Sequence, residues 1–140
     1  VVVADGSGGT HAGLAAGFGD HRRVLGVDVG FGAGLAEQVA ALAEAAAALT
    51  GRPAPSGEVQ LDPSLPEPYG APAAEVREAL ELAARTEGLV LDPVYTGRAL
   101  AALIARRRDG RVPADQPVVF LHTGGLPALF TGRYRDWFAV

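Results

Sequence analysis

A glycine-rich segment near the start of the chain combines the residue types that bind a small anion. Gly6, Ser7, Gly8, Gly9 and Thr10 are consecutive, so several backbone N–H groups and two hydroxyls lie together. At a helix N-terminus such donors suit phosphate. The segment lacks the lysine ending of a P-loop and the glycine spacing of a dinucleotide-binding loop. The alternative is a tight strand-to-helix turn that needs glycine only for its positive φ.

Other residue types that commonly do chemistry are few or absent. The sequence has no cysteine and no lysine, which excludes thiolate, disulfide and lysine-dependent chemistry from this chain alone. His11, His21 and His122 show no i, i+4 spacing and no carboxylate cluster joins them, so we expect no metal site. No serine lies in a nucleophile elbow. Asp92, which precedes a proline, is typical of a turn-forming residue.

Strands and helices are expected to alternate around these residues. The strands are predicted at 1–4, 24–29, 58–61, 89–91 and 117–122, and the helices at 10–18 (with Thr10 as N-cap), 35–49, 73–86, 98–108 and 126–130. This order predicts an α/β fold of three layers with a mostly parallel sheet covered on both faces. Ligands of such sheets bind beyond the carboxyl ends of the strands, where the glycine-rich turns fall.

Length and composition limit the class of protein. A chain of 140 residues, 49% of them hydrophobic, fits one domain, and a net charge of −4 disfavours a nucleic-acid partner. The apolar runs are too short to cross a membrane, and a cytoplasmic location is the default expectation. The chain has no methionine and opens on a strand-like run of valines, which we interpret as the middle of a fold. We therefore expect a fragment of a longer protein.

Four motifs, in order, resemble one enzyme family. They are residues 2–14 (VVADGSGGTHAGL), 65–70 (LPEPYG), 91–97 (LDPVYTG) and 121–130 (LHTGGLPALF). Together they are similar to the D-cysteine desulfhydrase and 1-aminocyclopropane-1-carboxylate deaminase family of pyridoxal-phosphate enzymes, which have the tryptophan synthase β-like fold. The resemblance implies that residues 1–140 are the C-terminal part of the cofactor-binding large domain. The small domain and the lysine that forms the Schiff base are then absent from this chain.

The resemblance also assigns roles to individual residues. The glycine-rich segment resembles the cradle for the phosphate of pyridoxal phosphate, and Thr123 resembles the hydroxyl that bonds to the pyridine nitrogen. Tyr69 and Tyr95 resemble the two active-site tyrosines near substrate, and phenols can relay protons or hold a carboxylate. Without the motifs, a buried ring with a satisfied hydroxyl would be the simpler interpretation of each tyrosine. Thr96 resembles a residue that sets substrate specificity.

The implied activity is α,β-elimination on a small amino acid. Thr96 and Thr123 match the desulfhydrase branch, whereas the deaminase branch has glutamate and leucine there. D-Cysteine would give pyruvate, sulfide and ammonia, in an enzyme that is a homodimer when complete. Aminocyclopropane-carboxylate deaminase and L-cysteate sulfo-lyase remain alternatives within the family. An inactive phosphate-binding fragment is the alternative from another class, and the lysine-free chain alone is predicted to be inactive.

Overall fold

The computed structural model describes residues 1–63 and 68–137. The strands are β1 (Val2–Asp5), β2 (Leu25–Asp28), β3 (Gln60–Asp62) and β4 (Phe120–Leu121), and the α-helices are α1 (Gly9–Phe18), α2 (Leu35–Leu49), α3 (Ala74–Glu87) and α4 (Thr96–Arg108). Three short 3₁₀ helices are η1 (His21–Arg23), η2 (Leu126–Phe130) and η3 (Gly132–Trp137). Residues 65–67 of the second motif and Phe138 lie outside the described residues.

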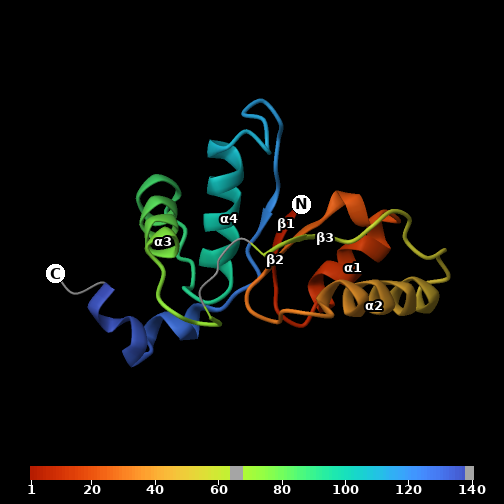
Figure 1. The fold of residues 1–140 in the computed structure, drawn as a ribbon, viewed down its shortest axis with the longest axis horizontal. Coiled ribbons are helices and arrows are strands. Elements are labelled where there is room, and N and C mark those ends of the chain that lie inside the picture. Colours follow the sequence, from red (N-terminus) through yellow and green to blue (C-terminus); the bar gives the residue numbers. More distant parts are fainter. Residues whose placement is uncertain (64–67, 138–140) are drawn as a thin grey trace.

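The four strands form one parallel sheet in the order β3-β2-β1-β4. Helices α1 and α2 cover one face, α4 covers the other, and α3 packs on the outside of α4 (Figure 1). The expected α/β class, with helical layers on both faces of a parallel sheet, is confirmed. Because all pairs are parallel, the carboxyl ends of the strands meet at one edge, and the chain places its turns there.

Two apolar clusters fix the layers to the sheet. Alanine and valine side chains of α1 and α2 pack together on one face, and Val2 and Val27 pack against two alanines of α4 on the other. The small alanine side chains let the helices approach the sheet and each other closely. A third cluster joins α3 to α4 around Val76, Leu80 and Leu91. Residues three and four apart along α3 therefore form its buried face, as in an amphipathic helix.

Three local predictions differ from the structure. Helix α1 is capped by Gly8, with φ of 80°, and not by Thr10, so the hydroxyl of Thr10 is left for other partners. The segment 89–91 is not a strand: β4 takes the place beside β1, and of the three residues only Leu91 is buried, against α3. The final predicted helix, 126–130, is a 3₁₀ helix with no buried residues.

Candidate active site

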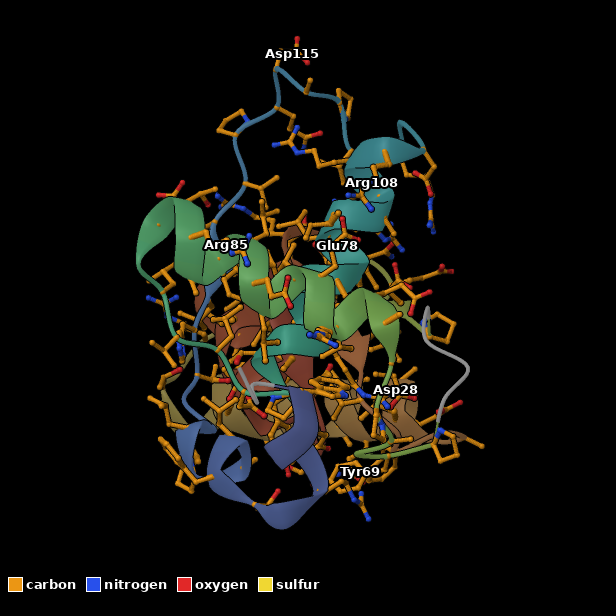
Figure 2. All side chains as sticks on the ribbon, turned by 90° about the vertical axis from the view of Figure 1, so that its left-hand side faces the viewer. Asp28, Tyr69, Glu78, Arg85, Arg108 and Asp115 are labelled. Atoms are coloured by element: carbon orange, nitrogen blue, oxygen red, sulfur yellow. The ribbon has the colours of Figure 1, made fainter. Side chains whose placement is uncertain are left out.

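A cavity of about 540 Å³ lies at the carboxyl edge of the sheet. Its lining comes from the turns after β1, β2 and β4, from the loop before α3 and from the start of α4: Ala4, Gly6, Ser7, Thr10, Val29, Gly30, Phe31, Tyr69, Tyr95, Thr123, Gly124 and Gly125. Figure 2 shows Asp28, the last residue of β2, and Tyr69 toward the same end of the molecule, with Asp115 at the opposite end. The topology thus brings distant segments of the sequence together at one edge.

The turn between β1 and α1 presents donors to this cavity. Gly6, Ser7 and Thr10 line the cavity. The first turn of α1 directs its free backbone N–H groups toward the N-terminal end of the helix, where these residues lie. Gly8 is instead turned toward α2, because a Cβ on it would lie 2.7 Å from a methyl group of Val39. Helix α2 holds the turn from behind, through the Gln38 amide, which donates to the Ser7 carbonyl at 2.7 Å.

The donor set fits a phosphate monoester. Among the described lining residues there is no lysine, arginine or histidine, so a bound anion would be held by backbone N–H groups, the hydroxyls of Ser7 and Thr10, and the positive end of the α1 dipole. Gly6 leaves room at the mouth of the turn: a Cβ there would already touch the Tyr95 ring at 3.6 Å. Gly8 and Gly9, which do not line the cavity, shape the turn.

Tyr69 and Tyr95 both line the cavity and contact each other. Their hydroxyls share a hydrogen bond, and their rings meet edge to face with centroids 6.0 Å apart. Half of Tyr69 is exposed, whereas Tyr95 is half-buried at the start of α4. The hydrogen bond to Tyr69, and then burial, raise the pKa of the Tyr95 phenol above its ordinary value. Tyr95 is therefore protonated at neutral pH and can donate a proton or a hydrogen bond.

Removing the Tyr69 hydroxyl should lower the pKa of Tyr95. The shared hydrogen bond stabilises the protonated phenol. Its contribution to the stability of the fold is therefore present at neutral pH and is lost as the pH rises through the raised pKa of Tyr95. In Tyr69→Phe we expect Tyr95 to ionise at lower pH than in the wild type, as followed by the ultraviolet absorbance of phenolate. Tyr95→Phe identifies the signal. An unchanged Tyr95 titration in Tyr69→Phe would contradict the pairing.

The loop that carries Tyr69 is held by residues that sequence reasoning missed. The guanidinium of Arg98, a buried residue of α4, donates to the carbonyls of Pro68 at 2.8 Å and Ala71 at 3.2 Å. The Tyr134 hydroxyl donates to the Gly70 carbonyl at 2.5 Å. No local pattern marks these partners, because they lie 27 to 64 residues from the carbonyls they bind.

Asp92 organises the start of α4, as expected of a turn-forming residue. Its carboxylate accepts backbone N–H groups from Val94, Tyr95 and Thr96, each at 2.8 Å. The Thr96 hydroxyl donates to the same carboxylate at 2.7 Å and accepts the Asp92 N–H at 2.9 Å. Thr96 is fully buried and does not line the cavity. The structure brings the other predicted side chains together but leaves Thr96 behind Tyr95.

Thr123 lies on the cavity in a turn braced by His122. The ring Nδ1 of His122 accepts the Gly124 N–H at 3.1 Å, and its Nε2 bonds to the Val90 carbonyl at 3.0 Å, which fixes the tautomer with hydrogen on Nε2. Gly125 approaches the Asp92 carboxylate so closely that a Cβ would collide with it. The Asp92 carboxylate therefore lies against the turn of Thr123 as well as at the start of α4.

Comparisons with known proteins show the family of the chain. Residues 1–124 match the family of pyridoxal-phosphate dependent enzymes, and the chain belongs to that family. Pyridoxal phosphate is therefore the cofactor of its family. The chain is also similar to a solved structure described as an ACC deaminase homologue, with a TM-score of 0.82 and 34% identity over 96% of this chain. The chain spans 41% of the length of that homologue.

The helices and the histidines bear on two further expectations, concerning a membrane span and a metal site. Within residues 1–63 and 68–137, no helix has the length and apolar character needed to cross a bilayer. Across the same residues, no three histidine or acidic side chains gather as metal ligands would. His11 and His21 are buried, and His122 serves the turn just described. Sequence reasoning did not identify Gly30 and Phe31 as lining residues, although the glycines around Phe31 mark a turn at a strand end.

Proposed function

We propose that the protein containing this chain is a pyridoxal-phosphate-dependent carbon–sulfur lyase of the D-cysteine desulfhydrase type. The observation that carries the proposal is the single cavity that joins the donor turn 6–10, the Tyr69–Tyr95 pair and Thr123. The donor turn would hold the phosphate. Thr123, which lines the same cavity, would offer a neutral hydroxyl to the ring nitrogen.

The neutral hydroxyl favours elimination over transamination. When bound, pyridoxal phosphate would withdraw electrons from the bonds to the α-carbon of the substrate. A threonine at the ring nitrogen leaves the ring less electron-withdrawing than an acidic partner would. Tyr95, with its raised pKa, would donate a proton or hold the substrate carboxylate, and Tyr69 would orient it through the shared hydrogen bond.

The rest of the enzyme would supply what this chain lacks. The sequence contains no lysine, so the amine that binds the cofactor aldehyde must come from a separate part of the protein. We assign the chain to the C-terminal part of the cofactor-binding large domain, and the small domain to that other part. The complete enzyme would be a homodimer acting on a small amino acid, and the chain alone would be inactive.

Two related activities and one unrelated role remain open. The solved homologue is described as related to ACC deaminase, which supports aminocyclopropane carboxylate as a rival substrate. Against it, Thr96 and Thr123 stand where the deaminase branch has a glutamate and a leucine. L-Cysteate is the other rival. The assay of all three substrates given below separates it from D-cysteine. An inactive phosphate-binding fragment would show binding without turnover.

The position of Thr96 changes how its role in specificity should be tested. Its hydroxyl is buried against Asp92, so it could affect substrate choice only by positioning Tyr95 and the turn of Thr123. A glutamate there would put a second carboxylate next to Asp92 in a dry site, which is costly. Thr96→Glu should therefore disrupt α4, and Thr123→Leu is the informative exchange.

Products from D-cysteine, aminocyclopropane carboxylate and L-cysteate test the proposal in one preparation of the full-length protein. We expect sulfide and pyruvate from D-cysteine to form at least about tenfold faster than 2-oxobutyrate from aminocyclopropane carboxylate, since thiolate is a good leaving group and ring opening lacks its glutamate. Thr123→Leu should narrow that ratio.

Other outcomes of this assay would assign the protein differently. Dominant 2-oxobutyrate would refute the desulfhydrase assignment, and faster sulfite release from L-cysteate would support the sulfo-lyase. Cofactor binding with no product from any substrate would support the inactive fragment. Tyr95→Phe serves as the control that activity arises at this cavity, and it should lower sulfide release about 100-fold.

A further inference from the structure

We infer that Asp5 and His11 form a buried positioning pair that sets the geometry of the donor turn 6–10 and, through it, the affinity for the cofactor's phosphate. Asp5 is the last residue of β1 and His11 lies in the first turn of α1, so the pair joins the two ends of the turn. The inference rests on the proposed assignment of this turn to phosphate.

The pair is short and fully enclosed. Asp5 Oδ2 lies 2.7 Å from His11 Nδ1, and the two side chains are 1% and 0% exposed. The Asp5 carbonyl also accepts the Val29 N–H at 3.1 Å, so the residue is tied to the strand beside it as well. A carboxylate inside a protein requires donors, and the imidazole Nδ1–H is placed to be one.

The neighbouring strand is shaped to admit this pair. Gly26 of β2 lies beside Val3 in the sheet, and a Cβ on Gly26 would collide with the Asp5 carboxylate and lie 2.6 Å from His11 Nδ1. The φ of Gly26 is not in the left-handed region, so its backbone conformation does not require glycine. Space for the Asp5–His11 pair is the reason that remains.

The buried ring of His11 carries a cost to the stability of the fold. Its other ring nitrogen, Nε2, is buried without a hydrogen-bond partner among the described residues. An unsatisfied buried polar atom destabilises a fold, and the apolar neighbours Ala12 and Ala15 show that α1 is otherwise packed with small apolar side chains on this face. The bond to Asp5 is the contact that can offset this cost.

Phosphate affinity follows from the order that the pair imposes. Donors that already point at the anion lose little conformational entropy when it binds, whereas a loose glycine-rich turn would have to be ordered by the ligand. Three of the five residues between Asp5 and His11 are glycines, and the N-cap Gly8 has no side chain to fix the turn. The Asp5–His11 bond supplies that constraint from behind the cavity.

A matched pair of substitutions at His11 tests this inference in the full-length protein. Asparagine keeps a donor near the position of Nδ1. Glutamine moves the donor to the position of Nε2 and so loses the hydrogen bond to Asp5. The readout is the dissociation constant of pyridoxal divided by that of pyridoxal phosphate. This ratio measures the contribution of the phosphate group to binding. We expect His11→Gln to lower this ratio about 10- to 100-fold and His11→Asn to keep it within about threefold of the wild type.

Three further variants separate the possible explanations. Gly26→Ala displaces the pair without removing a side chain and should also lower the ratio. Ala16→Gly weakens the same helix at a position five residues beyond His11, which does not share its helix face, and it should lower the melting temperature with no change in the ratio. Thr10→Val removes a hydroxyl of the turn itself and tests the phosphate assignment.

The outcomes are distinct. Wild-type ratios in both His11→Gln and Gly26→Ala, with a reduced ratio in Thr10→Val, would overturn the positioning role and leave the phosphate turn standing. Wild-type ratios in all three would overturn the phosphate assignment as well. Should His11→Gln fail to fold, Gly26→Ala decides by the same criterion. Equal weakening of pyridoxal and pyridoxal phosphate would show a merely structural role and would also overturn the inference.

Discussion

Replacing Asp92 with alanine is expected to lower the free energy of unfolding by about 3 kcal/mol. The carboxylate is fully buried and accepts three backbone N–H groups and one hydroxyl at the start of α4. Alanine leaves these donors without a partner, and all but the Tyr95 N–H are buried. Urea unfolding followed by circular dichroism measures the change.

The effect of Asp92→Ala should extend to the cavity. The carboxylate accepts the Tyr95 N–H and packs against the turn of Thr123, so cofactor affinity should fall together with stability. Asp109→Ala, at the other end of α4, is the control. Asp109 is exposed, accepts the Arg111 N–H at 3.0 Å and should change stability little. Equal losses in the two variants would contradict the role given to Asp92.

Gly30→Ala is expected to damage both stability and catalysis. Gly30 has a φ of 125°, and a Cβ there would lie 2.8 Å from the Cβ and 3.1 Å from the Cα of Tyr69. A backbone cannot yield as a flexible side chain can, so Tyr69 must move. We expect a loss of about 3 kcal/mol, from backbone strain and overpacking, and a fall in kcat of about 100-fold.

Gly32→Ala is a closely matched control for Gly30→Ala. Gly32 lies in the same turn with a φ of 82°, but nothing lies within 4 Å of the Cβ it would gain. This variant should cost only the strain of the left-handed conformation, about 1 kcal/mol, and keep near wild-type kcat. The same fall in kcat for both variants would show that the turn, and not Tyr69, is responsible.

The turn that holds Gly30 has its own anchor, which explains why its shape is predictable only in part. The Asp28 carboxylate accepts N–H groups from Gly30 at 2.8 Å, Phe31 at 2.7 Å and Gly32 at 3.0 Å. The glycines and the strand before them predict a turn at the sheet edge. That the turn would wrap around Asp28 and bring Phe31 to the cavity depends on side-chain geometry, which spacing alone does not encode.

Periodicity predicted the long elements well and the short ones poorly. Helix α2 has the predicted bounds, because alanine and leucine have high helix propensity and the glycines on either side of the run end the helix. The segment 89–91 has the apolar residues of a strand, yet the place beside β1 belongs to β4. Strand pairing is a competition between distant segments, so local sequence cannot decide it.

The site was predictable to the extent that it follows from topology. Strand-end turns of a parallel sheet must share an edge, and Ser7 and Thr123, which follow β1 and β4, accordingly line one cavity. Tyr95 lines the same cavity from the start of α4, although the segment before it is not a strand. The supports of these residues were not predictable, because Arg98 and the Asp5–His11 pair act through contacts behind the lining. Thr96 illustrates the difference: its motif neighbour Tyr95 faces the cavity, and Thr96 itself faces Asp92.

A crystal structure of the full-length protein with pyridoxal phosphate tests the central claim most directly. We predict that the phosphate lies against the donor turn 6–10 at the N-terminus of α1, within hydrogen-bonding distance of the hydroxyls of Ser7 or Thr10. The ring nitrogen should face Thr123, with Tyr69 and Tyr95 on the substrate side. Density that places the phosphate away from α1, or the ring nitrogen away from Thr123, would contradict the assignment of this cavity.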